Sequence, residues 1–399
     1  MADQPLAGLR IVEVSTFVAA PLGGMTLAQL GAEVVRVDPL GGAPDHTRWP
    51  LAESGTSLYW TGLNKAKRSV TVDLRSPAGQ ELVTRLVVES GIVLTNSVGR
   101  PWLGHAALAE RRPDVIHVQI EGMPGGGAAV DYTVNAALGF PLLTGPAGHA
   151  DPVNHVLPAW DIACGLYAAV GLLGAERHRT RTGEGAALSV ALSDVALAVA
   201  GNLGFLAEAE LGQRRPRLGN YLYGGFGRDF TSSDGIRFMI VTLTTRHWRD
   251  LIDATGLTEP VAALEASLGV DFSDEGNRYE CRELLAALLD RWFAGRDAAK
   301  ITAVLDRTSV LWAVYRSLPE VVSSDEVRAN PMMRVVDQPG VGRYLAPGSP
   351  IRAGEPVVSR APVLGEHTDA VLAEWLGLDN KEIRELHDRG VIRSAPRED

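Results

Sequence analysis

Asp131 is the residue of this chain whose surroundings most suggest chemistry. Three glycines, Gly125–Gly127, lead through AAV to Asp131 at the start of a predicted helix. An aspartate in that position most often caps the free backbone N–H groups of its own helix. An aspartate carboxylate is also ionised at neutral pH, so it can attack an acyl group without a general base and form a mixed anhydride. The sequence leaves both interpretations open, a helix cap and a covalent nucleophile.

Two other segments carry the same kind of ambiguity. Asp161 precedes an apolar helix in PAWDIACG, where an N-cap is again the simpler interpretation. Gly224, Gly225 and Gly227 lie in GNYLYGGFG. These glycines either make a turn or form a mobile flap whose backbone closely approaches a reacting group.

A short basic segment, NKAKR, precedes a predicted strand. It places Lys65, Lys67 and Arg68 within four residues. Composition alone favours a solvated turn. The functional alternative is a clamp for phosphate groups, because lysine and arginine supply charged donors to phosphate oxygens.

Familiar signatures for other chemistry are missing from the sequence. The first predicted strand is followed by STFVAAPLGG and not by G-x-G-x-x-G, and there is no G-x-x-x-x-G-K-[ST], G-x-S-x-G or H-E-x-x-H. The nine histidines and two cysteines lack metal-ligand spacing. We therefore expect neither a dinucleotide site nor a bound metal.

Composition limits the class of protein and its partners. The 399 residues are 46% hydrophobic and 22% charged, with a net charge of −10, which is typical of a globular protein and unsuited to nucleic acid or an anionic membrane. No signal peptide or membrane-spanning stretch is visible. Cys164 and Cys281 form no disulfide framework, so we expect a reducing compartment, most simply the cytoplasm.

The elements that must position these residues follow an α/β pattern. Residues 8–14 and 33–38 are predicted strands around a helix at 21–31, and this β-α-β spacing predicts a parallel sheet. Further strands are expected at 69–74, 92–95 and 115–120. Residues 158–211 are expected to be mostly helical with a break at 182–185, residues 231–243 to form a hairpin, and residues 331–362 to be irregular.

Five segments in order resemble class III CoA-transferases, a family that includes α-methylacyl-CoA racemases. They are GLRIVEVSTFVAAPLGGMTLAQLGAEVVRVD, LNKAKRSVTVDLRSPAG, VDYTVNAALG, DIACGLYAAVGLLGAERHRTRTGEG and APVLGEHTDAVLAEWLGL. The resemblance spans the chain. It implies an α/β fold with a Rossmann-like large domain at residues 1–215 and 330–399, a smaller α+β domain at 225–325, and linkers at 216–224 and 326–340. It also implies an interlocked homodimer, with each active site between the large domain of one subunit and the small domain of the other.

The resemblance also assigns roles to residues. Asp131 matches the family's nucleophile, and coenzyme A is the implied group carried by the substrate. Implied contacts to CoA are made by Val18, Ala19, Lys65, Lys67, Arg68 and Arg100. The implied substrate contacts are Gly224, Gly225, Gly227, His155, Tyr223 and Arg228.

The same resemblance favours one reaction over others. Racemases of the family carry histidine where this chain has Val130, and valine cannot accept a proton. The implied reaction is CoA transfer through a covalent aspartyl intermediate, most simply between the two carboxyl groups of one branched five-carbon dicarboxylic acid. The alternatives are transfer between two different acids, racemisation, and a non-catalytic CoA- or nucleotide-binding protein.

Overall fold

The structure is a computed structural model, and it describes residues 4–352 and 358–396. The chain divides into two compact units. Within the described residues, the first comprises the chain up to Leu138, His155–Gly212 and the chain from Ser324 onward, and the second comprises Gly139–Asn154 and Gln213–Ser323. Residues 139–154, assigned above to the large domain, belong to the second unit. Each unit is described by itself.

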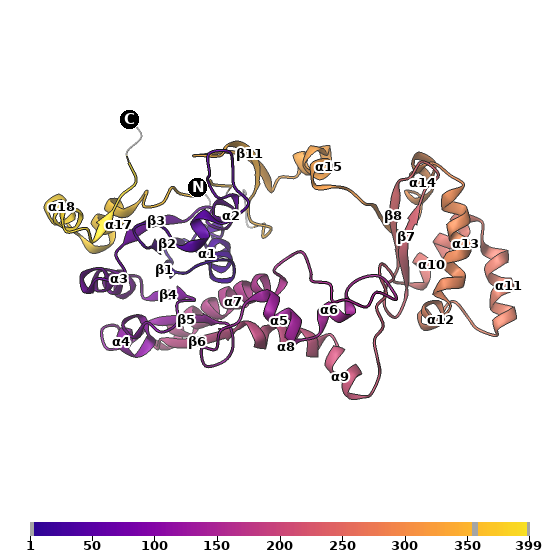
Figure 1. Cartoon of the computed structure of the whole chain (residues 1–399), viewed down its shortest axis with the longest axis horizontal. Helices are drawn as coiled ribbons and strands as arrows, with labels where there is room; N and C mark the ends of the chain where they lie inside the picture. Colours follow the sequence, from indigo (N-terminus) through magenta and orange to yellow (C-terminus); the bar gives the residue numbers. More distant parts are fainter. Residues whose placement is uncertain (1–3, 353–357, 397–399) are drawn as a thin grey trace. The chain divides into compact units, whose positions relative to one another are not determined.

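A seven-stranded sheet forms the centre of the first unit (Figure 1). Its order is β12-β3-β2-β1-β4-β5-β6. The strands are β1 (Arg10–Val14), β2 (Glu33–Asp38), β3 (Arg68–Val72), β4 (Ile92–Thr95), β5 (Ile116–Glu121), β6 (Ala186–Ala191) and β12 (Ile392–Arg393). Strands β1 to β6 pair in parallel, and β12 is antiparallel to β3. This confirms the predicted α/β fold with a parallel sheet. The order reverses between β1 and β4, and in such sheets ligands bind beyond the carboxyl ends of the strands at that point.

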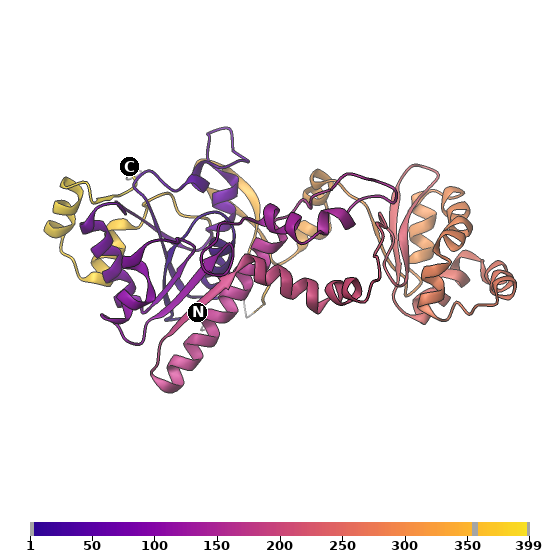
Figure 2. The ribbon, with the colours of Figure 1, turned by 60° about the horizontal axis from the view of Figure 1, so that its bottom comes forward.

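Helices cover the sheet and connect its strands. In the first unit they are α1 (Ala19–Gln29), α2 (Leu58–Leu63), α3 (Pro77–Ser90), α4 (His105–Ala109), α5 (Asp131–Ala137), α7 (Ala159–Thr182), α8 (Leu192–Asn202), α9 (Phe205–Glu210), α16 (Asp325–Ala329), α17 (Thr368–Leu376) and α18 (Asn380–Asp388), with 3₁₀ turns at Pro44–Thr47 and Pro101–Leu103. Figure 2 shows the long helix α7, in pink, beside the sheet. Gly23 of α1 and Gly165 of α7 let these two helices meet backbone to backbone.

Both ends of the chain contribute to one apolar core. Val12 and Val70 of the sheet pack in the same cluster as Val371 and Trp375 of α17 and Ile392 of β12. These side chains are at most 4% exposed. The C-terminal segment is therefore part of the first unit's core.

The second unit is a small α+β structure. Its antiparallel strands are β7 (Phe226–Thr231), β8 (Arg237–Thr242) and β9 (Leu311–Val314). Its helices are α6 (Phe140–Leu143), α10 (Thr245–Thr255), α11 (Thr258–Leu268), α12 (Glu275–Glu280), α13 (Arg282–Ala294), α14 (Ala298–Leu305) and α15 (Leu318–Ser323). Helices α10 to α14 lie on one side of the β7–β8 hairpin (Figure 1). The predicted hairpin at 231–243 is found, beginning a few residues earlier.

Two segments of the chain differ from the sequence-based expectations. Residues 186–191 form β6 inside a stretch predicted to be mostly helical, because pairing with β5 extends the parallel sheet and outweighs local helix propensity. Residues in the expected irregular stretch form a second hairpin, β10 (Met333–Gln338) with β11 (Gly342–Pro347).

Candidate active site

Asp131 lies in the first turn of α5 and is 2% exposed. The N-cap of α5 is Val130, so the expectation that Asp131 caps its own helix is wrong. The Val130 side chain is 60% exposed and offers no proton acceptor beside Asp131.

Three donors surround the Asp131 carboxylate. Its Oδ2 accepts hydrogen bonds from the backbone N–H groups of Trp160, at 2.7 Å, and Asp161, at 3.2 Å. Its Oδ1 lies 2.6 Å from Nε2 of His155, whose side chain is 23% exposed. The predicted site residues Asp131 and His155 are thus in direct contact within the first unit.

The N-terminus of α7 explains why two backbone N–H groups can donate to Asp131. Its N-cap is Pro158, which supplies no side-chain acceptor, and the first N–H groups of a helix have no partner within the helix. Asp131 of α5 therefore caps α7. The partial positive charge at that helix end also stabilises the carboxylate. Asp161 is not the N-cap of α7, contrary to the simpler expectation above.

The side chain of Asp161 has a different environment from that of Asp131. It makes no hydrogen bond or ion pair among residues 4–352 and 358–396. Burial, reinforced by the neighbouring negative charge of Asp131, raises the pKa of Asp161 to about 7, and Arg48 opposes this shift. Burial raises the pKa of Tyr59 and that of Cys164 to about 12, and the negative charge of Asp161 contributes to both increases.

A mainly apolar cavity of about 590 Å³ reaches the first turn of α7. Val18 and Leu22 of the α1 region, Tyr59 of α2 and Lys65 line one part, and Pro158 and Ile162 of α7 line another. The β10–β11 hairpin contributes further lining side chains, including Tyr344. The cavity thus lies beside the helix end that holds Asp131, and it includes two of the residues expected to contact CoA, Val18 and Lys65.

Lys65 and Lys67 are both buried but have different neighbours, and Ala66 between them adopts a left-handed φ of 64°. Lys65 lines the cavity, its ammonium donates to the carbonyl of Gly62, and burial lowers its pKa to about 8. The ammonium of Lys67 is enclosed by Glu13 (2.8 Å), the Pro21 carbonyl and Asn64. This geometry does not support a phosphate contact by Lys67, and the expectation of a solvated turn is wrong.

The other residues expected to contact CoA lie away from the cavity lining. Arg68 pairs with Glu33 and Glu374, both at 2.6 Å, so its charge is already compensated. Ala19 is buried at the start of α1, and Arg100 is half-buried before a 3₁₀ turn. None of these three lines the cavity beside Lys65.

The remaining expected substrate contacts lie in the second unit. Gly224, with φ 74°, and Gly225 form a turn, but Gly227 lies within β7 opposite Val241, so the three glycines do not form one flap. Tyr223 stacks on Arg215 at 3.9 Å and meets Tyr279 edge to face.

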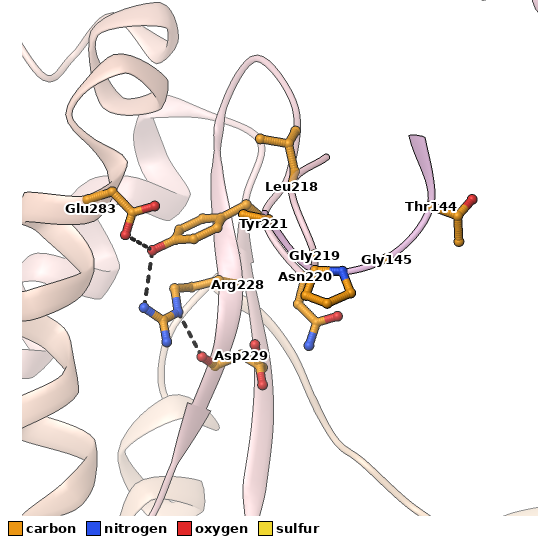
Figure 3. A pocket seen from close by; sticks show the side chains of 11 residues that line it. Thr144, Gly145, Leu218, Gly219, Asn220, Tyr221, Arg228, Asp229 and Glu283 are labelled. Atoms are coloured by element: carbon orange, nitrogen blue, oxygen red, sulfur yellow. Dashed lines mark hydrogen bonds between the residues drawn. The ribbon is translucent and has the colours of Figure 1, made fainter. Parts of the chain in front are cut away.

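Arg228 lines a pocket of about 700 Å³ in the second unit (Figure 3). The Tyr221 hydroxyl accepts a hydrogen bond from Arg228 at 3.1 Å and donates one to Glu283 at 2.9 Å. Arg228 also pairs with Asp290 at 3.5 Å. With Asp229 in the lining as well, the pocket has more acidic than basic side chains near it, and the guanidinium is largely engaged within the protein.

The fold brings groups to Asp131 and to its neighbour Asp161 that the sequence patterns did not indicate. The Trp160 N–H is a backbone donor, which no side-chain pattern reveals, although PAWD before an apolar helix marks the helix start. Arg48 and Tyr59 approach Asp161 from a distant part of the chain, and no sequence spacing indicates this.

No group of histidine, cysteine or acidic residues suited to a metal ion is found among the described residues. Likewise, no helix in the described ranges is long and apolar enough to cross a membrane.

Comparison with known proteins identifies the family. The model of CoA-transferase family III matches residues 6–368, nearly the whole chain. The protein therefore belongs to CoA-transferase family III, as the sequence motifs predicted.

Individual relatives differ widely in similarity. The 2-methylfumaryl-CoA isomerase of Chloroflexus aurantiacus is 50% identical over 403 residues and covers 98% of both chains. The human succinyl-CoA:glutarate CoA-transferase is 25% identical, over 98% of this chain and 90% of its own. Among solved structures, a CAIB/BAIF family protein from Brucella suis matches with a TM-score of 0.77 at 28% identity, over 93% of this chain and 99% of that one.

Proposed function

We propose that this protein is a 2-methylfumaryl-CoA isomerase, which moves coenzyme A between the C1 and C4 carboxyl groups of mesaconyl-CoA. The 50% identity to such an isomerase over the whole chain supports this substrate more than the 25% identity to a transferase acting between two acids. The observation that carries the chemistry is the Asp131 carboxylate, held by three donors beside an apolar cavity.

The first half of the reaction is an acyl transfer to Asp131. The carboxylate attacks the thioester carbonyl, a C–O bond forms, the C–S bond breaks, and CoA leaves as thiolate. The thiolate then attacks the Asp131 carbonyl of the mixed anhydride. This forms an aspartyl-CoA thioester and releases the acid as a dicarboxylate.

The second half reverses these steps with the other carboxyl group. That carboxylate attacks the aspartyl thioester and expels CoA thiolate, which then attacks the acid's carbonyl and frees Asp131. Keeping the acid in the site makes this step effectively intramolecular, with the rate gain of proximity. Two similar thioesters are interconverted, so no nucleotide hydrolysis is needed.

The cavity at α7 is the proposed site for the pantetheine arm of CoA. Its apolar lining suits the methylene and methyl groups of that arm, and the buried Lys65 ammonium supplies a cation for a CoA phosphate. Oδ1 of Asp131 is covered by His155, so the imidazole has to move, or share the oxygen, when the thioester approaches.

A racemase is not supported. Asp161 could move a proton, but Val130 leaves the second position without a base.

We also propose a homodimer, as the family resemblance implies. Apolar side chains are exposed on α7, α8, α9 and the turn between α8 and α9 of the first unit, and exposed apolar surface of this kind often marks a protein interface. They include Leu166, Tyr167, Val170, Leu197, Leu203 and Leu206, which are 42–69% exposed. Light scattering should give twice the chain mass of 42.6 kDa. A monomer at micromolar concentration would contradict the proposal.

The decisive experiment supplies mesaconyl-C1-CoA as the sole substrate and follows the C4 isomer by chromatography. Isomerisation without an added acid supports intramolecular transfer, and a strict need for a second carboxylic acid supports transfer between two acids.

Asp131→Ala should lower the rate by roughly a thousandfold or more while CoA still binds. Hydroxylamine added during turnover should modify Asp131 in the unchanged protein. Transfer retained by Asp131→Ala would rule out the covalent mechanism.

A further inference from the structure

The two oxygens of the Asp131 carboxylate are held in different ways. Oδ2 accepts from two main-chain N–H groups, at 2.7 and 3.2 Å, which are fixed in the first turn of a 24-residue helix. Among the residues that the structure describes, Oδ1 has one hydrogen-bonding partner, the imidazole of His155, which belongs to a side chain that is 23% exposed. Oδ1 is therefore the oxygen that can be released to attack, and Oδ2 is the one that stays in place.

We propose that the Trp160 and Asp161 N–H groups form an oxyanion hole for attack on the carbonyl of Asp131 itself. The inference rests on the proposed covalent mechanism and adds to it. A helix cap needs only a stable carboxylate. An oxyanion hole has a second task. After Asp131 has been acylated, it stabilises the negative charge that develops on Oδ2 when a nucleophile adds to Cγ.

The charge on Oδ2 follows from the steps of the reaction. In the mixed anhydride, Oδ1 bridges to the acyl carbon and Oδ2 becomes a carbonyl oxygen. When CoA thiolate adds to Cγ of Asp131, a C–S bond forms and the carbonyl electron pair moves onto Oδ2. When the tetrahedral intermediate collapses, the Cγ–Oδ1 bond breaks, and the acid leaves with Oδ1. The second carboxylate later adds to Cγ and again puts the charge on Oδ2.

The position and strength of the donors suit this task. They already lie at hydrogen-bond distance from Oδ2, so no reorganisation is required, and the helix end adds its partial positive charge. The Asp161 side chain makes no hydrogen bond among the described residues, so its N–H acts without competition from its own carboxyl group. Removal of one oxyanion-hole donor typically lowers kcat by about a hundredfold to a thousandfold.

The test removes the N–H group of residue 161 by replacing one backbone amide with an ester, which also makes the Trp160 carbonyl a weaker acceptor within α7. Lactic acid incorporated at position 161 by cell-free translation replaces the backbone N–H with an ester oxygen, and Asp161→Ala, with its amide intact, is the matched control. The helix does not use this N–H, so both proteins should fold, and thermal melting checks this. Attack on the substrate thioester places its charge on a substrate oxygen, so this step should not need the hole.

The expected result separates the two steps. Relative to Asp161→Ala, the ester protein should isomerise about a hundredfold more slowly, while the first release of CoA thiol, measured with a thiol reagent, keeps its rate. Hydroxylamine should then capture more of the anhydride. Equal isomerisation rates, or an equal slowing of thiol release, would overturn the oxyanion hole and leave the covalent mechanism intact. A failure to detect any adduct at Asp131 in the unchanged protein would overturn both proposals.

Discussion

Lys65 and Lys67 show how much the role of a side chain depends on its immediate surroundings. Lys67→Met should lower the free energy of unfolding by about 3–5 kcal/mol. The substitution removes the ammonium group that pairs with the Glu13 carboxylate, and Glu13 is fully buried. Lys65→Met should change stability little but weaken CoA binding by roughly tenfold, because the ammonium lines the cavity. Urea unfolding and calorimetric titration with CoA measure the two effects. A large loss of stability in Lys65→Met, or a loss of CoA binding in a folded Lys67→Met protein, would contradict this account.

Asp161 should make stability depend on pH. Its pKa is raised from 3.8 to about 7, so the folded protein holds a proton that the unfolded chain has already lost between these values. The stabilisation is complete below pH 4 and is lost as pH rises through 7. Asp161→Asn should therefore raise the Tm more at pH 8 than at pH 5. An equal change in Tm at pH 5 and pH 8 would contradict this account of Asp161.

At the scale of elements, the contact between α1 and α7 positions the site. A Cβ on Gly165 would lie 2.3 Å from the Ala19 carbonyl oxygen, so Gly165→Ala must push the helices apart. We expect a loss of about 1–3 kcal/mol in stability and a lower isomerisation rate, because the first turn of α7 carries the donors to Asp131. Gly174→Ala on the same helix meets no atom within 4 Å and should be neutral or stabilising by up to about 1 kcal/mol. Chemical unfolding and kcat of both variants provide the comparison.

At the scale of the whole molecule, the C-terminal segment completes the core of the first unit. Trp375 is 4% exposed, packs against the sheet core and donates its indole N–H to Glu33 at 3.1 Å. Trp375→Ala should cost about 3–5 kcal/mol of stability. Trp49 is 77% exposed, and Trp49→Ala should cost less than about 0.5 kcal/mol. Similar denaturation midpoints for the two variants would mean that the C-terminal segment contributes little to the core.

Local patterns in the sequence were sufficient for much of this fold. Short apolar runs rich in valine and isoleucine predicted β1, β2, β4 and β5, because parallel strands are buried on both faces. Strand β6 was missed, because its six residues AALSVA carry no strong local preference and become a strand only by pairing with β5.

The sequence by itself determined the family, the parallel sheet and the candidate nucleophile Asp131, because each depends on residue types at short spacing. The tertiary structure alone decided which groups hold the Asp131 carboxylate and which of two neighbouring lysines reaches a cavity. The donors to Asp131 are 24 to 30 residues away along the chain, and Glu13 is 54 residues from Lys67. Hydrogen bonds and desolvation act over a few ångströms in space, so only packing of the helices on the sheet brings such groups within range.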